Sequence, residues 1–100
     1  MTVITIAEEF VDPILRGRKV TTIRRGFRKY PIGPGVMRSG AFDIPVDITD
    51  VQFKTFHDLT QADAIRDGLS TIEALKSTLY RFYPDLSGND TFTIVEFHTK

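Results

Sequence analysis

The chain contains no cysteine among its 100 residues. It can therefore form no disulfide, no thiolate metal site and no cysteine nucleophile, and such a composition fits a reducing compartment. It also lacks an apolar run long enough to span a bilayer. The stretch MTVITIAEEF at the start of the chain has neither the basic head nor the long apolar segment of a secretory signal peptide. We therefore expect a cytoplasmic protein with no membrane partner.

The chain also lacks net charge, with 13 basic and 13 acidic residues, but its charges are unevenly distributed. Residues 1–40 carry eight basic and three acidic side chains (8 − 3 = +5), and residues 41–100 carry five and ten (5 − 10 = −5). Seven of the 13 basic residues lie between Arg16 and Lys29. This density suits phosphates or another anionic ligand, although a solvated basic loop would have the same composition.

Length and periodicity predict one α+β domain over residues 1–100, because a chain of this size can bury a single modest core. The expected elements are a strand at 3–6, a short helix with Asp12 as N-cap and Gly17 at its C-terminal end, a strand at 20–24, a mostly loop region at 26–40 with room for one short strand, a strand from Phe42, a helix at 60–67, a helix from Ser70 to Phe82, and a strand at 91–98.

The strand that starts at Phe42 carries the signature of a β-bulge. Apolar residues alternate strictly over 42–48, but Val51 and Phe53 continue in the opposite phase. One extra residue near Thr49 and Asp50 would restore the phase, and such bulges are common where a sheet curls into a barrel. A curled sheet or barrel with helices at its end is therefore the simplest architecture.

The last predicted helix carries an apolar stripe. Ser70 and Glu73 have the spacing of a capping box at its start. The stripe is interpreted as core packing and not as a ligand site, and it consists of Ile72, Leu75, Leu79 and Phe82.

The most specific stretch of the chain is GRKVTTIR at residues 17–24. It resembles the G-x-K-x-x-T-I-R signature of ASCH domains, which are small relatives of the PUA RNA-binding barrel. Later landmarks of the resemblance keep their order and spacing: Asp58-Leu59-Thr60, Ala64, Asp67-Gly68-Leu69, Leu79 through Tyr83-Pro84, and the final strand at 93–97. The resemblance covers nearly the whole chain, and it implies a PUA-like curled β-sheet or barrel with flanking helices.

Within this superfamily the chain resembles the small bacterial N4-acetylcytidine amidohydrolases in length and layout. The resemblance implies that Lys19 and Thr22 are catalytic, without any cofactor, and it places Asp67 where those enzymes have a glutamate. Aspartate is one methylene shorter. Its carboxylate must therefore approach from a backbone about an ångström nearer, or act through a water.

Amide hydrolysis needs a nucleophile, a group that moves protons, and donors for the developing oxyanion. Thr22 would be the nucleophile, and Lys19 could activate it when its amine is neutral. A lysine starts near a pKa of ~10.4, which burial and the charge of Arg24 would lower. Asp67 would hold the threonine or the leaving amine and shuttle its proton.

Strand geometry assigns Thr22 and Arg24 to one polar side facing a cleft, with Thr21 and Ile23 on the other side. Lys19 can meet Thr22 only because it lies in the junction before the regular strand. The candidate substrate-binding residues are Arg24, Thr21, Arg25 and Tyr30. Each has a structural alternative: Thr21 as a strand-forming residue, the arginines as surface cations, and Tyr30 as a loop anchor and not a stacking platform for a base.

Two other functions compete with the hydrolase: an RNA-binding ASCH module, and a metal-dependent ribonuclease as some ASCH proteins are described. No metal site is expected, because His57 and His98 have no second ligand at metal spacing and Asp43 and Asp47 suit the wet face of a strand. The expected partner is a nucleoside or nucleobase, with RNA as the alternative, and the oligomeric state stays open.

Overall fold

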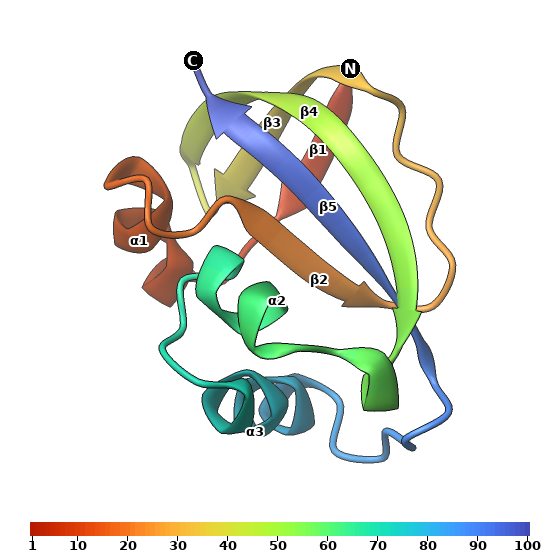
Figure 1. Ribbon diagram of the computed structural model, residues 1–100. Coiled ribbons are helices and arrows are strands. Elements are labelled where there is room, and N and C mark those ends of the chain that lie inside the picture. The colour runs from red at the N-terminus through yellow and green to blue at the C-terminus, as the bar shows by residue number, and fades with distance from the viewer.

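A curled five-stranded sheet forms the body of the molecule, and the computed structural model describes residues 1–100 (Figure 1). The elements in chain order are β1 (Thr2–Thr5), the 3-10 turn η1 (Glu8–Phe10), α1 (Val11–Leu15), β2 (Thr21–Arg25), β3 (Gly33–Ser39), β4 (Phe42–Thr55), the 3-10 turn η2 (Phe56–Asp58), α2 (Gln61–Arg66), α3 (Ile72–Phe82) and β5 (Thr91–Thr99). None of the helices has the length and apolar character needed to cross a membrane.

The strand order in the sheet is β1-β3-β4-β5-β2. β1 and β3 pair in parallel, and the other neighbours are antiparallel. In Figure 1, β4 and β5 arch across the sheet, and α2 and α3 lie below β2. The edge strand β2 is therefore the strand that adjoins the helices.

The predicted β-bulge is confirmed in β4. The register against β5 shifts between Ile48 and Asp50, so the first part of the strand pairs with β3 and the second part only with β5. Pro45 lies just before the first pair with β5, at Val46, where its missing N–H interrupts no ladder on that side. The bulge bends the 14-residue strand and curls the sheet.

Two clusters of nine buried residues each form the core, and β5 contributes to both. One cluster packs α1 against β1, β3 and β4; the other packs α2 and α3 against β2 and β5. Val95 and Phe97 belong to the first cluster, whereas Phe92 and Ile94 belong to the second. Because β5 alternates between two packed faces, it is buried on both sides along most of its length.

Three local predictions need correction. The N-cap of α1 is Phe10 and not Asp12, because η1 runs directly into the helix; Asp12 instead forms an ion pair with Arg16, one turn later, at 2.8 Å. The N-cap of α3 is Thr71, whose hydroxyl accepts from the Ala74 N–H at 3.1 Å, so no capping box forms at Ser70. The region at 26–40 holds one strand, as the sequence allows, but this strand, β3, covers seven residues and is stabilised by neighbours on both sides.

Candidate active site

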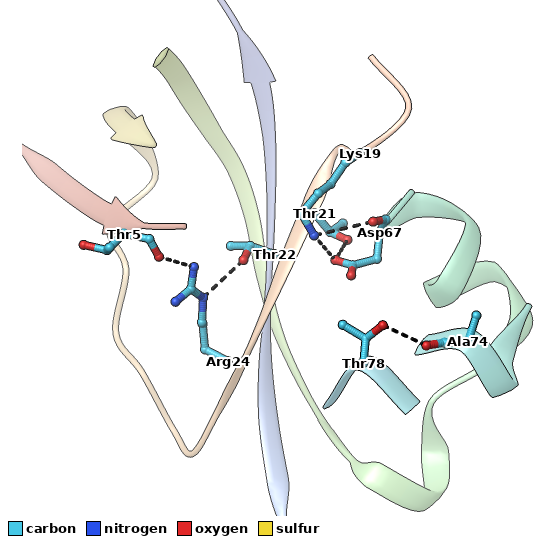
Figure 2. A network of polar contacts seen from close by, with 8 residues as sticks. All are labelled: Thr5, Lys19, Thr21, Thr22, Arg24, Asp67, Ala74 and Thr78. Carbon is cyan, nitrogen blue, oxygen red and sulfur yellow. Dashed lines mark hydrogen bonds and ion pairs between the residues drawn. The ribbon is translucent and has the colours of Figure 1, made fainter. Parts of the chain in front are cut away.

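The junction between α1 and β2 brings Lys19 against the end of α2. Lys19 and Asp67 form an isolated antiparallel β-bridge, and the Val20 N–H donates to the Arg66 carbonyl at 2.8 Å. The Lys19 Nζ donates to Asp67 Oδ1 at 2.8 Å (Figure 2). Because the two backbones are already paired, an aspartate reaches the lysine directly, with no bridging water.

Gly68 makes this close approach possible. Its φ of +88° lies in the left-handed region, and a Cβ there would come within 3.1 Å of Lys19 Cβ. This glycine therefore lets the segment that carries Lys19 pass close beside the end of α2.

Thr21 completes the contact with Asp67. Its hydroxyl donates to Asp67 Oδ1 at 3.1 Å, and its side chain is only 1% exposed. Thr21 does not line the cavity described below. Thr21 therefore holds the Asp67 carboxylate in place through a hydrogen bond. It neither lines the cavity, as a substrate-binding residue would, nor serves only to form the strand.

Thr22 and Arg24 lie on one side of β2, as strand parity predicts, but Ile23, which parity assigns to the other side, also lines the cavity described below. The Arg24 Nε donates to Thr22 Oγ1 at 3.2 Å, and its Nη2 donates to the Thr5 carbonyl at the end of β1 (Figure 2). Among the hydrogen bonds of the structure, Thr22 Oγ1 is only an acceptor. Its own proton is thus available to another base, while a cation already contacts its oxygen.

A cavity of about 70 Å³ joins these polar groups. Its polar lining comes mainly from β2 and Asp67, and its apolar lining comes mainly from η1 and from α3. The lining residues are Ala7, Phe10, Lys19, Thr22, Ile23, Arg24, Asp67, Thr78, Leu79, Phe82 and Tyr83.

The cavity corrects the prediction that the apolar stripe of α3 is only core. Leu79 is buried but lines the cavity, and Phe82 lines it while remaining 44% exposed. Phe10 and Thr78 also line it and were not predicted. The only sequence signal for Thr78 is its position on α3 four residues before Phe82, a spacing that puts the two side chains on one face of the helix.

Burial shifts the pKa values of the buried pair toward each other. It lowers the pKa of the Lys19 ammonium, although the charge of Asp67 opposes the shift. It raises the pKa of the Asp67 carboxyl, against the opposing effects of Lys19 and the Thr21 hydrogen bond. The neutral amine that a lysine base requires is therefore easier to reach here than in water.

The remaining predicted residues lie outside the cavity. Arg25 forms ion pairs with Asp85 and Asp90, both at 2.8 Å. Tyr30 packs against the first core cluster. The structure therefore brings Lys19, Thr22, Arg24 and Asp67 together and leaves Arg25 and Tyr30 apart.

No family model matches the chain. It is 30% identical over 99 residues to the N(4)-acetylcytidine amidohydrolases of Escherichia coli and Escherichia fergusonii, with 94% of this chain and 92% of each relative covered. The chain belongs to the N(4)-acetylcytidine amidohydrolase family. This membership confirms the prediction of an enzyme that hydrolyses an amide.

Solved structures confirm the predicted fold. An ASCH domain from Lactobacillus crispatus has a TM-score of 0.80 at 13% identity, covering 98% of this chain and 79% of that one. A protein from Enterococcus faecalis has a TM-score of 0.83 at 13% identity, covering 100% and 76%. An ASCH protein from Zymomonas mobilis has 0.67 at 17%, covering 96% and 67%. The chain therefore has the ASCH fold.

Proposed function

We propose that this chain removes the acyl group from N4-acylated cytosine or cytidine, with Thr22 as the nucleophile. The observation that carries the proposal is that Thr22, Arg24, Lys19 and Asp67 open onto one cavity. The names of its relatives supply the substrate to test first, N4-acetylcytidine.

In the first step Lys19, as the neutral amine, takes the proton of the Thr22 hydroxyl. The Thr22 oxygen then forms a bond with the acetyl carbon, and the carbonyl electron pair moves to its oxygen. When the tetrahedral intermediate collapses, the bond from carbon to N4 breaks, and N4 takes the proton from the Lys19 ammonium. Cytidine leaves, and the acetyl group stays on Thr22 as an ester.

In the second step a solvent water attacks the ester. Lys19 accepts one proton of the water and returns it to the Thr22 oxygen as the bond between that oxygen and the acetyl carbon breaks. Acetic acid leaves and loses its remaining proton to solvent to become acetate, and the enzyme is restored. Arg24 contacts the Thr22 oxygen through Nε, so its charge favours both the alkoxide and the nearby oxyanion.

Asp67 has a positioning and proton-sharing role in this scheme. It accepts from Lys19 at 2.8 Å and from Thr21 at 3.1 Å, which fixes the amine at the cavity wall. Because burial raises the pKa of Asp67 and lowers that of Lys19, a proton can move within the pair as the leaving amine needs one.

The charge arrangement favours a small neutral substrate over RNA. Four of the seven basic residues between positions 16 and 29 have acidic partners: Arg16, Arg18, Lys19 and Arg25. An RNA-binding surface would instead leave its cations free for phosphates. For a metal-dependent ribonuclease, no group of three or more histidine and acidic side chains is placed to hold a metal ion.

The test is turnover of N4-acetylcytidine, followed by the ultraviolet change as cytidine forms. We expect turnover by the wild-type chain and by Thr22→Ser, which keeps a hydroxyl, and none by the near-isosteric Thr22→Val. Thr93→Val is the matched control, because Thr93 is also a buried strand threonine and its hydroxyl donates to Gly26 outside the cavity. Full turnover by Thr22→Val would exclude the covalent mechanism.

A further inference from the structure

The cavity is too small for the molecule that it is proposed to receive. Its volume of about 70 Å³ has room for a few water molecules. Pockets that bury a drug-sized ligand measure ~300–1,000 Å³. The walls must therefore separate for an acylated pyrimidine to be buried beside Thr22.

Two aromatic rings that line the cavity pack against each other. Phe10 belongs to η1 and Phe82 to the last turn of α3, and their ring centroids are 5.9 Å apart with an interplanar angle of 46°. A base stacked between two rings needs about 3.5 Å on each side, so the centroids would be ~7 Å apart. The gap between the rings must widen by about an ångström, and the rings must turn toward parallel.

An ion pair joins the same two walls next to these rings. Arg81 Nη1 and Nη2 contact the two carboxylate oxygens of Glu9 at 2.7 and 2.9 Å. It is the only ion pair between the segment Glu8–Leu15 and α3. The Arg81 guanidinium also lies 4.8 Å from the centroid of the Phe82 ring. This bidentate contact therefore fixes the distance between the walls from outside the cavity.

We propose that the segment Glu8–Leu15 moves away from α3 to admit the cytosine ring between Phe10 and Phe82, and that the Glu9–Arg81 ion pair sets how often this opening occurs. The inference rests on the proposed function for the identity of the base. Phe10 and Phe82 are then base-binding residues, and Glu9 and Arg81 are positioning residues.

Opening of the cavity can be measured without an activity assay, by the reaction of one introduced cysteine with a thiol reagent. The chain has no cysteine of its own, so the introduced thiol is the only one that reacts. Thr78→Cys places one thiol on the cavity wall, and its rate of reaction with a thiol reagent follows the opening. The Glu9–Arg81 pair is about half exposed, so breaking it with Glu9→Gln or Arg81→Gln should speed labelling about two- to fivefold. The charge swap Glu9→Arg with Arg81→Glu should restore the slower rate.

Ser77→Cys is the matched control, because it lies exposed on the same helix and should react at one rate in every background. Unchanged labelling of Thr78→Cys in the single variants would overturn the role of the ion pair. A swapped double variant that labels as fast as the single variants would overturn it too.

The aromatic part is tested by kinetics with N4-acetylcytidine. Loss of a stacked base contact in Phe82→Ala should raise KM about five- to 150-fold with a smaller change in kcat. Phe27→Ala removes an exposed ring outside the cavity and should leave KM unchanged. If the wild type turns over and Phe82→Ala keeps the same KM, the base-binding inference fails while the proposed function stands. If the wild type has no turnover, the proposed function and the base assignment both fail, and labelling still decides the opening.

Discussion

Replacing Lys19 with methionine should make the stability of the folded chain fall as pH rises. The substitution removes the ammonium that lies 2.8 Å from the Asp67 carboxylate and leaves that carboxylate 6% exposed. Burial already raises the pKa of Asp67 in the wild type. Without Lys19, only the hydrogen bond from Thr21 and the charge of Arg24 oppose this effect, so the pKa rises further.

The sign and size of the effect follow from proton binding. The unfolded chain has an aspartate pKa of ~3.9. If the pKa of Asp67 is higher in the folded chain, the contribution of this carboxyl to the free energy of unfolding is largest below pH ~3.9, where it is protonated in both states. Stability then falls by up to about 1.4 kcal/mol per pH unit until the folded pKa is passed. Removing one partner of a buried ion pair typically costs about 3–5 kcal/mol, a large share of the ~5–15 kcal/mol that stabilises a domain.

Urea unfolding at about pH 5 and about pH 8 measures this effect for the wild type, Lys19→Met and the double variant Lys19→Met with Asp67→Leu. We expect the stability deficit of Lys19→Met relative to the wild type to be larger at the higher pH. The double variant carries no buried charge at these positions and should show no such growth. Equal deficits of Lys19→Met at both pH values would refute the description of Lys19 and Asp67 as a mutually dependent buried pair.

Other consequences can be measured with the same preparations. Thr21→Val removes the hydrogen bond to Asp67 and should lower the free energy of unfolding by about 1.5–3 kcal/mol in urea titrations, whereas a loss below ~0.5 kcal/mol would contradict the contact. Gly68→Ala should cost about 1 kcal/mol and also lower kcat, because its Cβ presses on Lys19, while Gly40→Ala, also at positive φ but with open space around it, should lower stability alone. Since Lys19 acts as the neutral amine, kcat/KM should rise with pH through its lowered pKa, and a flat profile would exclude a lysine base.

The sequence predicted those elements whose signal lies within a short stretch of neighbouring residues, such as β4 and its bulge. The alternation around residues 42–53 contained both the strand and its bulge, because the change of phase is visible in the sequence itself. β3 was less visible because its Gly33-Pro34-Gly35 start resembles a loop, and it forms a strand through pairing with β1 and β4. Such distant pairing leaves no trace in a short window of sequence.

In the candidate site, too, the residues within one short motif were predicted, and the contacts between distant segments were not. The signature at residues 17–24 pointed to Lys19, Thr22 and Arg24, which one junction and one strand carry. The role of Phe10 and Phe82 in lining the cavity was not predicted. Phe82 continues the apolar stripe of α3 one turn beyond its last buried residue, Leu79, and so it was interpreted as core. Its contact with Phe10 joins residues 72 positions apart, as the ion pair beside it also does (82 − 10 = 72).

Hydrolysis of N4-acetylcytidine by the wild type, Thr22→Ser and Thr22→Val is the decisive test of Thr22 as the nucleophile. We expect release of cytidine by the wild type and Thr22→Ser, and no release by a folded Thr22→Val. Release by Thr22→Val at the wild-type rate would contradict the threonine nucleophile, and no release by the folded wild type would contradict the proposed substrate.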